Sequence, residues 1–137
     1  MMNARQNREK QPLRLLIVDG VAHTRHSLAS FLQLQENLEV VGETAVAADA
    51  LHLTQQLNPD VIIMGLNLLD MDGFSAAQEL RKVDPTCAII LLTIRSQAQD
   101  VQKAKDAGAI ALIETSAGID PILFILSSIS SDDVEGK

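Results

Sequence analysis

Five short apolar runs recur along the chain and alternate with longer amphipathic stretches. The runs are continuously apolar, a pattern typical of strands that are buried on both faces of a parallel sheet. Each of the first four runs is followed by enough residues for a helical crossover to the next strand. The pattern therefore predicts an α/β fold with strands at 13–19, 38–43, 60–65, 87–94 and 109–114.

Helical signals fill the segments between and after these strands. In the first segment, Leu28, Phe31 and Leu32 are spaced three and four residues apart, which places them on one face of a helix. Pro85 ends the third helical segment, and Gly108 closes the fourth as a C-cap. The predicted helices are 22–35, 47–57, 74–84, 97–108 and 118–130.

Strand order follows from the way parallel strands are connected. Right-handed crossovers put helices on both faces of the sheet and give a doubly wound sandwich. The flavodoxin-like order 2-1-3-4-5 brings the carboxyl ends of the first and third strands together at the switch point, where ligands bind in this architecture. Asp19 and Gly65 end those two strands. The third strand therefore presents backbone, and no side chain, at the edge where chemistry is expected.

The length of 137 residues suits one domain with a single core. We expect a flexible N-terminal arm over 1–12, a folded domain over 13–130, and a tail or the start of a linker over 131–137. The single cysteine, Cys87, cannot form an internal disulfide, and its place at the start of a strand predicts a buried structural thiol.

Composition argues against several classes of partner. A net charge of -7 and the absence of Trp and Tyr argue against nucleic-acid binding by this segment. The longest apolar run, PILFILSSIS, is too short to cross a bilayer. The polar N-terminus lacks the apolar core of a secretory signal. We therefore expect no membrane association and, by elimination, a cytoplasmic location.

Four motifs follow one another at a recognisable spacing: RLLIVDG, PDVIIMGLNLLDMDG, AIILLT and AGAIALIETS. With this order and spacing, the chain from Leu13 to about Ser130 resembles the receiver domains of bacterial two-component response regulators. The resemblance implies a CheY-like fold. It also implies, for an ordinary member, transfer of a phosphoryl group from a histidine kinase to an aspartate at the end of the third strand. Mg²⁺ bound by that aspartate and by an acidic pair after the first strand would assist the transfer.

The residues at the corresponding positions depart from that pattern. One acid of the pair remains and the phosphoacceptor is missing, as are the lysine of the fifth strand and the aromatic residue that commonly reports phosphorylation. The hydroxyl of the fourth strand remains. These positions hold Asp19 and Gly20 for the acidic pair, Gly65 for the acceptor, Thr93 for the hydroxyl, Thr115 and Ser116 for the lysine and the proline that usually follows it, and Leu112 for the aromatic residue.

Such a site lacks what phosphotransfer needs. Mg²⁺ is commonly bound through one or two carboxylates plus phosphate oxygens, and phosphoryl transfer depends on positioning and charge neutralisation. With one carboxylate and no lysine, we expect neither a bound metal or cofactor nor standard phosphotransfer. The chain is then no enzyme but a degenerate receiver.

Other polar residues near this edge have structural explanations. Asp72 precedes Gly73 and suits the N-cap of the next helix, and Asp70 lies too far along the loop to be aligned with Asp19 as a substitute acceptor. Asp19 either caps a loop by accepting backbone N–H groups or binds a cation weakly.

Two further features bear on ligand binding. His23 and His26 share a helix face, but no third metal ligand is evident from the sequence. Glu114 should repel anions from the end of the fifth strand. A metal site and a phosphate pocket are both disfavoured.

The last predicted helix is apolar over more than one inward stripe, and an apolar outer face needs cover. Receiver domains often associate through the face of helix 4, strand 5 and helix 5, which corresponds here to 97–108, 109–114 and 118–130. The alternative is that some of these side chains simply pack over the sheet. The candidate interface residues are Ile119, Ile122, Leu123, Phe124, Ile125, Leu126 and Ile129.

The resulting functional hypothesis is a phosphorylation-independent module for protein interaction or dimerisation, with itself, a histidine kinase or an output domain as partner. One alternative is a small-ligand sensor that uses the space left by Gly20 and Gly65. Another is phosphoacceptance at an unconventional residue. The 131–137 segment also suits a linker to an effector, and any DNA-binding role in transcription regulation would then lie outside these residues.

Overall fold

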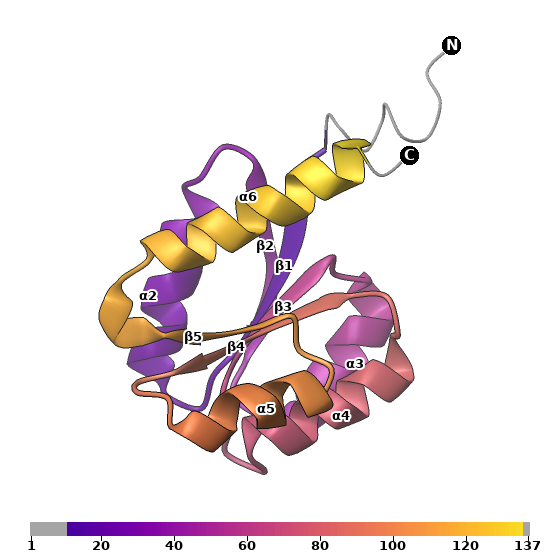
Figure 1. Ribbon diagram of the computed structural model, residues 1–137. Helices are drawn as coiled ribbons and strands as arrows, with labels where there is room; N and C mark the ends of the chain where they lie inside the picture. Colours follow the sequence, from indigo (N-terminus) through magenta and orange to yellow (C-terminus); the bar gives the residue numbers. More distant parts are fainter. Residues whose placement is uncertain (1–10, 136–137) are drawn as a thin grey trace.

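A five-stranded parallel sheet forms the centre of the computed structural model, which describes the backbone of residues 11–135 and the side chains of residues 11–130 (Figure 1). The strand order is β2-β1-β3-β4-β5, as the sequence predicts, so the flavodoxin-like topology is confirmed. The strands are β1 (Leu13–Val18), β2 (Leu38–Thr44), β3 (Val61–Gly65), β4 (Ala88–Thr93) and β5 (Ala111–Glu114).

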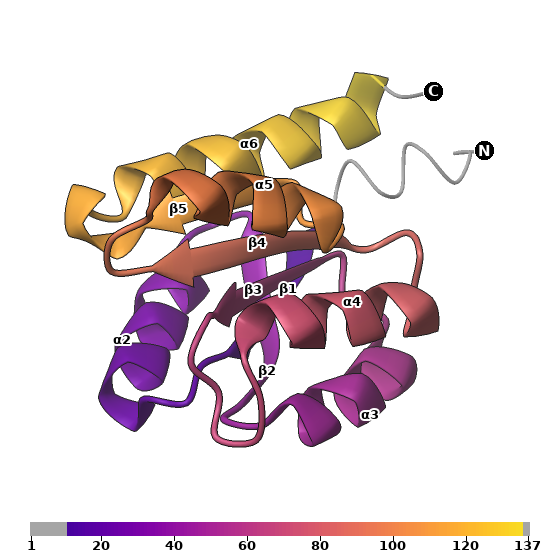
Figure 2. The ribbon, with the colours of Figure 1, turned by 60° about the horizontal axis from the view of Figure 1, so that its bottom comes forward.

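Five helices cover the sheet on its two faces (Figures 1 and 2). On one face lie α2 (Ala22–Gln33) and α6 (Asp120–Glu135). On the other lie α3 (Ala47–Leu57), α4 (Gly73–Val83) and α5 (Ala98–Asp106). A short 3-10 helix, η1 (Thr115–Ala117), connects β5 to α6. None of the described helices is long and apolar enough to cross a membrane.

The strand side chains divide between two apolar layers. In β3, Ile62 and Met64 face α3, α4 and α5, whereas Val61 and Ile63 face α2 and α6. All five residues of β3 are buried, because helices cover both faces of this central strand. Burial on both sides explains why the strands read as continuous apolar runs.

Element boundaries lie within two residues of the expected ones, except at the end of the last helix. α2 ends at Gln33, two residues before the predicted end, and α6 continues to Glu135. Residues 131–135, which the sequence analysis assigned to a tail or linker, are therefore helical. They contain neither Gly nor Pro, and Gly136 is the first residue that favours a helix end. Most of the predicted arm, residues 1–10, lies outside the described part of the chain.

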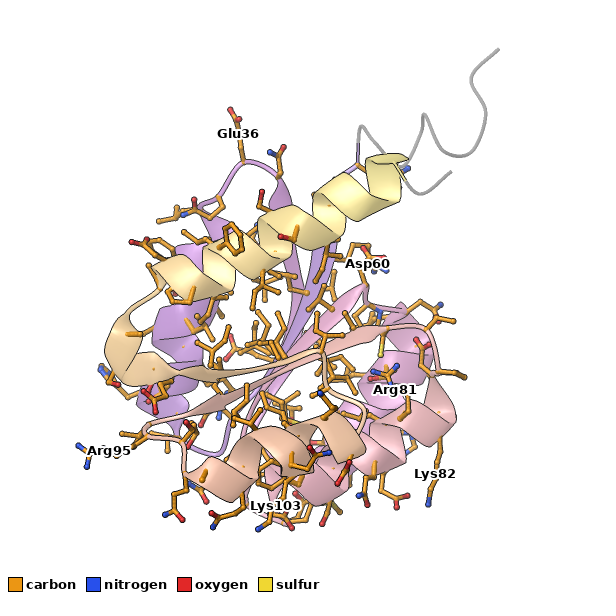
Figure 3. The ribbon with its side chains drawn as sticks, in the orientation of Figure 1. Glu36, Asp60, Arg81, Lys82, Arg95 and Lys103 are labelled. Atoms are coloured by element: carbon orange, nitrogen blue, oxygen red, sulfur yellow. The ribbon has the colours of Figure 1, made fainter. Side chains whose placement is uncertain are left out.

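Arg81 connects three segments at the end of the sheet opposite to the candidate site. Its guanidinium donates to the carbonyl oxygens of Pro85 (3.0 Å), Cys87 (2.6 Å) and Gly108 (2.8 Å). Gly108 has φ +92°, and a Cβ there would lie 3.1 Å from Arg81 Nε. A single side chain thus holds the end of α4 against the start of β4 and the turn before β5 (Figure 3).

Replacing Arg81 tests this connection. We expect Arg81→Ala to lower the free energy of unfolding by about 2 kcal/mol or more, because it leaves part-buried carbonyl groups without a donor. The neighbouring Lys82→Ala is the matched control, since Lys82 points outward and makes an exposed ion pair with Glu79 (3.3 Å). Its effect should stay within about 0.5 kcal/mol. Urea unfolding of both variants measures the difference, and equal losses would contradict the role of Arg81.

Candidate functional site

Four residues singled out from the sequence line one hollow of about 180 Å³ at the carboxyl edge of the sheet. Asp19 follows β1, Gly65 ends β3, Thr93 ends β4 and Thr115 follows β5. They meet because parallel strands end at the same edge, although long stretches of sequence separate them. Gly20, also a candidate, lies beside this hollow against the loop after β3.

The carboxylate of Asp19 lies over Gly65. A Cβ placed on Gly65 would be 2.9 Å from Asp19 Oδ2 and 3.1 Å from Asp19 Cγ, both closer than ordinary contacts. Asp19 Oδ1 accepts the Val21 backbone N–H at 2.8 Å. Asp19 therefore caps the turn between β1 and α2, one of the two roles expected from the sequence, and its carboxylate takes the space where a side chain on residue 65 would begin.

Gly20 allows two loops to touch backbone to backbone. Its N–H donates to the carbonyl oxygen of Asn67 at 3.2 Å, and a Cβ at Gly20 would lie 2.5 Å from that oxygen. No side chain fits such an approach unless the backbone moves. The β3–α4 loop (residues 66–72) therefore rests directly on the turn after β1.

The two aspartates of the β3–α4 loop cap helices. Asp70 accepts the backbone N–H groups of Ala47 (2.7 Å) and Ala48 (3.1 Å) at the start of α3, and the first of these bonds lowers its pKa below the usual value. Asp72 accepts the backbone N–H (2.9 Å) and the hydroxyl (2.8 Å) of Ser75, which lower its pKa. The N-cap prediction for Asp72 is confirmed, and neither carboxylate lines the hollow.

Residues at the ends of β4 and β5 are bonded locally. The hydroxyl of Thr93 donates to the carbonyl oxygen of Arg95 at 3.3 Å. Glu114 accepts the backbone N–H (2.8 Å) and hydroxyl (3.0 Å) of Ser96, and these bonds lower the pKa of Glu114. Glu114 thus ties β5 to the loop after β4. Leu112 is half-buried against the α3–α5 side of the core, and Ser116 lies exposed in η1.

Two polar residues at this edge were missed by the sequence analysis. Asn67 supplies the carbonyl oxygen that binds Gly20, and Arg25 donates to the carbonyl oxygen of Asp19 at 2.8 Å. Arg25 also pairs with Glu43 (3.1 Å), whose Oε1 lies 2.8 Å from His26 Nδ1. No local pattern marks either residue, because their partners lie on other elements.

The donor set of the hollow does not fit Mg²⁺, the ion that an ordinary receiver site binds. Its lining offers one carboxylate, Asp19, whose Oδ1 already accepts an N–H, and threonine hydroxyls. Mg²⁺ requires near-octahedral oxygen ligands, commonly with one or two carboxylates. The described part of the chain also holds no group of three His, Cys, Asp or Glu side chains close enough to bind a metal.

Burial corrects the interface candidates on α6. Ile122 and Leu126 are buried in the core, so they cannot belong to an outward face. Ile119, Leu123, Ile125 and Ile129 are partly buried and pack against the same cluster. Phe124, with 74% of its surface exposed, is the candidate that projects from the helix. The prediction of a broad apolar outer face was wrong, because most of these side chains pack against the sheet.

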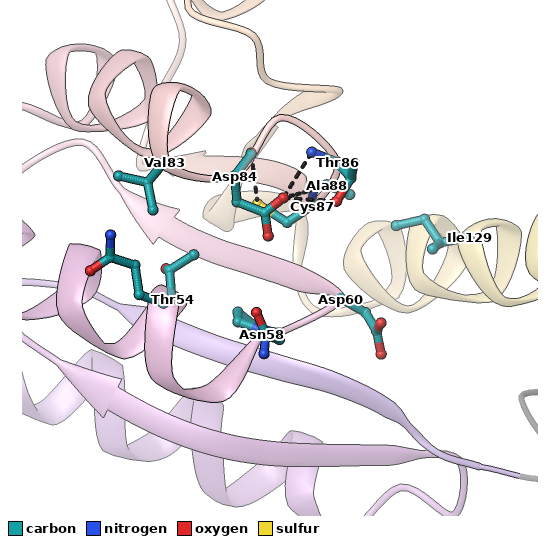
Figure 4. A pocket seen from close by; sticks show the side chains of 11 residues that line it. Thr54, Asn58, Asp60, Val83, Asp84, Thr86, Cys87, Ala88 and Ile129 are labelled. Carbon is teal, nitrogen blue, oxygen red and sulfur yellow. Dashed lines mark hydrogen bonds between the residues drawn. The ribbon is translucent and has the colours of Figure 1, made fainter.

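A larger hollow of about 700 Å³ opens at the opposite edge of the sheet, far from the candidate site (Figure 4). Asp84, in its lining, accepts from the Thr86 backbone N–H (2.8 Å) and hydroxyl (2.7 Å). Burial raises the pKa of the Cys87 thiol to about 11, so the group stays protonated and a poor nucleophile. The expected buried structural thiol is confirmed.

The 2-1-3-4-5 sheet with its loop cluster at the ends of β1, β3, β4 and β5 defines a receiver-type α/β domain. Residues 15–123 match the family described as "Response regulator receiver domain", and the chain belongs to this family. The resemblance noted from the sequence motifs is thereby confirmed at the level of the family.

Individual relatives agree with this assignment. The chain is 35% identical over 109 residues to the response regulator protein VraR of Staphylococcus epidermidis, a match that covers 79% of this chain and 52% of VraR. The chain thus spans about half the length of the curated relatives it matches.

Solved structures share the fold at lower sequence identity. The signal receiver domain of the putative response regulator NarL from Mycobacterium tuberculosis superposes with a TM-score of 0.81 at 22% identity, covering 88% of this chain and 98% of that one. A CheY-like receiver domain protein from Methanospirillum hungatei gives 0.82 at 21% identity, covering 93% and 100%.

Because Asp70 and Asp72 cap helices as carboxylates, we expect the fold to lose stability at low pH. Because hydrogen bonds hold the pKa of Asp70 and Asp72 below 3.8 in the folded state, their stabilisation is complete above that value. It is lost as pH falls through the folded-state pKa. We expect Asp72→Asn, which keeps an oxygen for the cap, to reduce this loss between about pH 6 and pH 3 in urea unfolding.

Asp106→Asn is the matched control, because Asp106 is exposed and accepts from the side chain of Gln102 on its own helix. It should lose as much stability on acidification as the unmodified chain. If Asp72→Asn lost just as much, Asp72 would not carry the pH dependence.

Proposed function

We propose that this receiver domain acts in two-component signalling without aspartyl phosphorylation, as a module that binds other proteins. The observation that carries the proposal is the Asp19 carboxylate lying over Gly65, 2.9 Å from where a Cβ would be. The end of β3 offers no nucleophilic side chain, and the neighbouring Asp19 carboxylate lies where a side chain on residue 65 would begin.

The electrostatics of the site support the same proposal. Phosphoryl transfer depends on positive charge near the transferred group. Among the described residues, no Lys or Arg lines the hollow, and Thr115 stands where the family resemblance places a lysine. Asp70 and Asp72, the acids nearest in sequence after β3, are engaged with the N-termini of α3 and α4.

Incubation with a small acyl phosphate and Mg²⁺, followed by intact-mass measurement, tests the proposal. We expect no phosphoryl adduct, because neither an acceptor carboxylate nor a set of Mg²⁺ ligands is present. A receiver domain that retains its aspartate should gain one adduct in the same reaction. An adduct on this chain that depends on Mg²⁺ would overturn the proposal, and mapping would begin with Asp19 and Asp70.

The size of the hollow favours an interaction module over a ligand sensor. Small-molecule pockets usually have volumes of about 300–1,000 Å³. The hollow at Gly65 measures about 180 Å³, and the loop resting on Gly20 takes up part of the space left by the missing side chains. The alternative of a metabolite sensor is therefore less well supported.

Self-association through the face of α5, β5 and α6 forms part of the proposal. Exposed apolar residues lie on or next to these elements: Val101 on α5 (58% exposed), Ile110 directly before β5 (54%) and Phe124 on α6 (74%). Contiguous exposed apolar patches mark interaction sites in soluble proteins, and we propose these three residues as the apolar part of such a site. A kinase or an output domain is the other kind of partner that this face would take.

A charge placed in this face should weaken the dimer. We expect Ile110→Glu to raise the dimer dissociation constant about tenfold or more, since a carboxylate would be buried in an apolar contact. Leu34→Glu is the control, because Leu34 is 81% exposed at the end of α2, outside this face.

Sedimentation equilibrium over a range of concentrations measures both variants and the unmodified chain. A chain that stays monomeric throughout, or equal weakening by the two substitutions, would contradict association through this face.

A further inference from the structure

We propose that Gly20, Asn67 and Asp70 form a clasp that fixes the β3–α4 loop in one position without a bound cation. The inference rests on the proposed function and goes further. It assigns a positioning role to Gly20, which stands where an ordinary receiver has an acid, and to two residues of the loop after β3. Gly20 positions the loop through its backbone contact with Asn67, and Asp70 positions it through its hydrogen bonds to the start of α3.

The first half of the clasp joins the β3–α4 loop to the turn after β1. The Gly20 N–H binds the Asn67 carbonyl oxygen at 3.2 Å, with room for a hydrogen but not for a methyl group on the Gly20 Cα. A side chain on residue 20 would push the loop away, since its Cβ would lie 2.5 Å from a backbone atom that has no free rotation. Glycine is therefore required for this contact.

The second half joins the same loop to the start of α3. Asp70 spans the N–H groups of Ala47 (2.7 Å) and Ala48 (3.1 Å), and the Leu69 N–H donates to the Ala45 carbonyl oxygen at 3.1 Å. A helix N-terminus stabilises a carboxylate through its free N–H groups and its dipole. The negative charge of Asp70 is thus balanced by protein N–H groups, with no metal needed.

The loop is also bonded within itself between these two anchors. Asn67 and Asp72 form an isolated antiparallel bridge, and the Leu68 N–H donates to the Met71 carbonyl oxygen at 3.2 Å. Anchors at two places on a closed loop leave it little freedom to rotate or shift. The clasp holds Leu69, which is 71% exposed, at a constant place on the surface.

Restoring the lost carboxylates one at a time should therefore not restore an ordinary site. Gly65→Asp would place its Cβ 2.9 Å from Asp19 Oδ2, so the Asp19 side chain would have to shift and its cap on the Val21 N–H would be disturbed. Gly20→Asp would displace the loop that it is meant to assist. The loop position thus depends on Gly20, and the position of the Asp19 carboxylate depends on Gly65.

Hydrogen exchange of the full chain, without Mg²⁺ or phosphoryl donor, tests the clasp. In Gly20→Ala, the amides of Leu68 and Leu69 should exchange about tenfold faster, the effect of losing a structural hydrogen bond. In Asp70→Ala, the amides of Ala47 and Ala48 should exchange faster by a similar factor of about ten.

Two controls match these substitutions. Gly42→Ala adds a methyl group that meets the ends of the Leu16 and Leu57 side chains at 3.3 and 3.4 Å, and Asp106→Ala removes an exposed carboxylate. Both should leave exchange in the β3–α4 loop within about twofold of the unmodified chain. If Gly20→Ala does not fold, Asp70→Ala still decides the question.

Unchanged loop and α3 exchange in the two test variants would overturn the clasp, as would Mg²⁺ that slowed exchange in the unmodified loop. A phosphoryl adduct would instead overturn the proposed function. Because the clasp is measured without donor or metal, the two failures are separate results.

Discussion

The close contact between the turn after β1 and the loop after β3 is the interaction on which the rest of this site depends. It exists because the first and third strands are neighbours in a parallel sheet and end at the same edge. Gly20 allows the backbones to meet, and Asp19 then turns its carboxylate over Gly65. Two adjacent residues of one turn, Asp19 and Gly20, thus hold a carboxylate and a neighbouring loop at the switch point.

The same turn also shows how the carboxylate beside Gly65 is stabilised. An ordinary receiver site gathers carboxylates whose mutual repulsion a cation must offset. Here Asp19 is the carboxylate that lines the hollow, and it accepts the Val21 N–H. Asp70, outside the hollow, accepts the N–H groups of Ala47 and Ala48. Backbone N–H groups of the protein thus hold both carboxylates.

Much of the fold follows from local sequence patterns. Continuous apolar runs such as 61–65 indicated strands covered on both faces, and the crossovers between them limited the topology to a doubly wound sheet. Helix ends were less certain. α6 continued past its predicted end at residue 130, and no Gly or Pro stands between that residue and Gly136. The predicted apolar outer face of α6 failed for a different reason. The width of an apolar stripe does not reveal how many of its side chains are buried against the sheet. Ile122 and Leu126 proved to be core residues.

The sequence by itself determined the family, the strand order and the absence of a carboxylate at residue 65, because motif spacing and residue identity are local properties. It also predicted Asp72 as a helix cap, which needs only the next few residues. Three contacts were decided by the tertiary structure alone. Asp70 caps α3, Arg25 binds the backbone of Asp19, and Gly20 contacts the backbone of the loop after β3. These contacts join residues far apart in the chain, and their distances are set by how the sheet and helices pack.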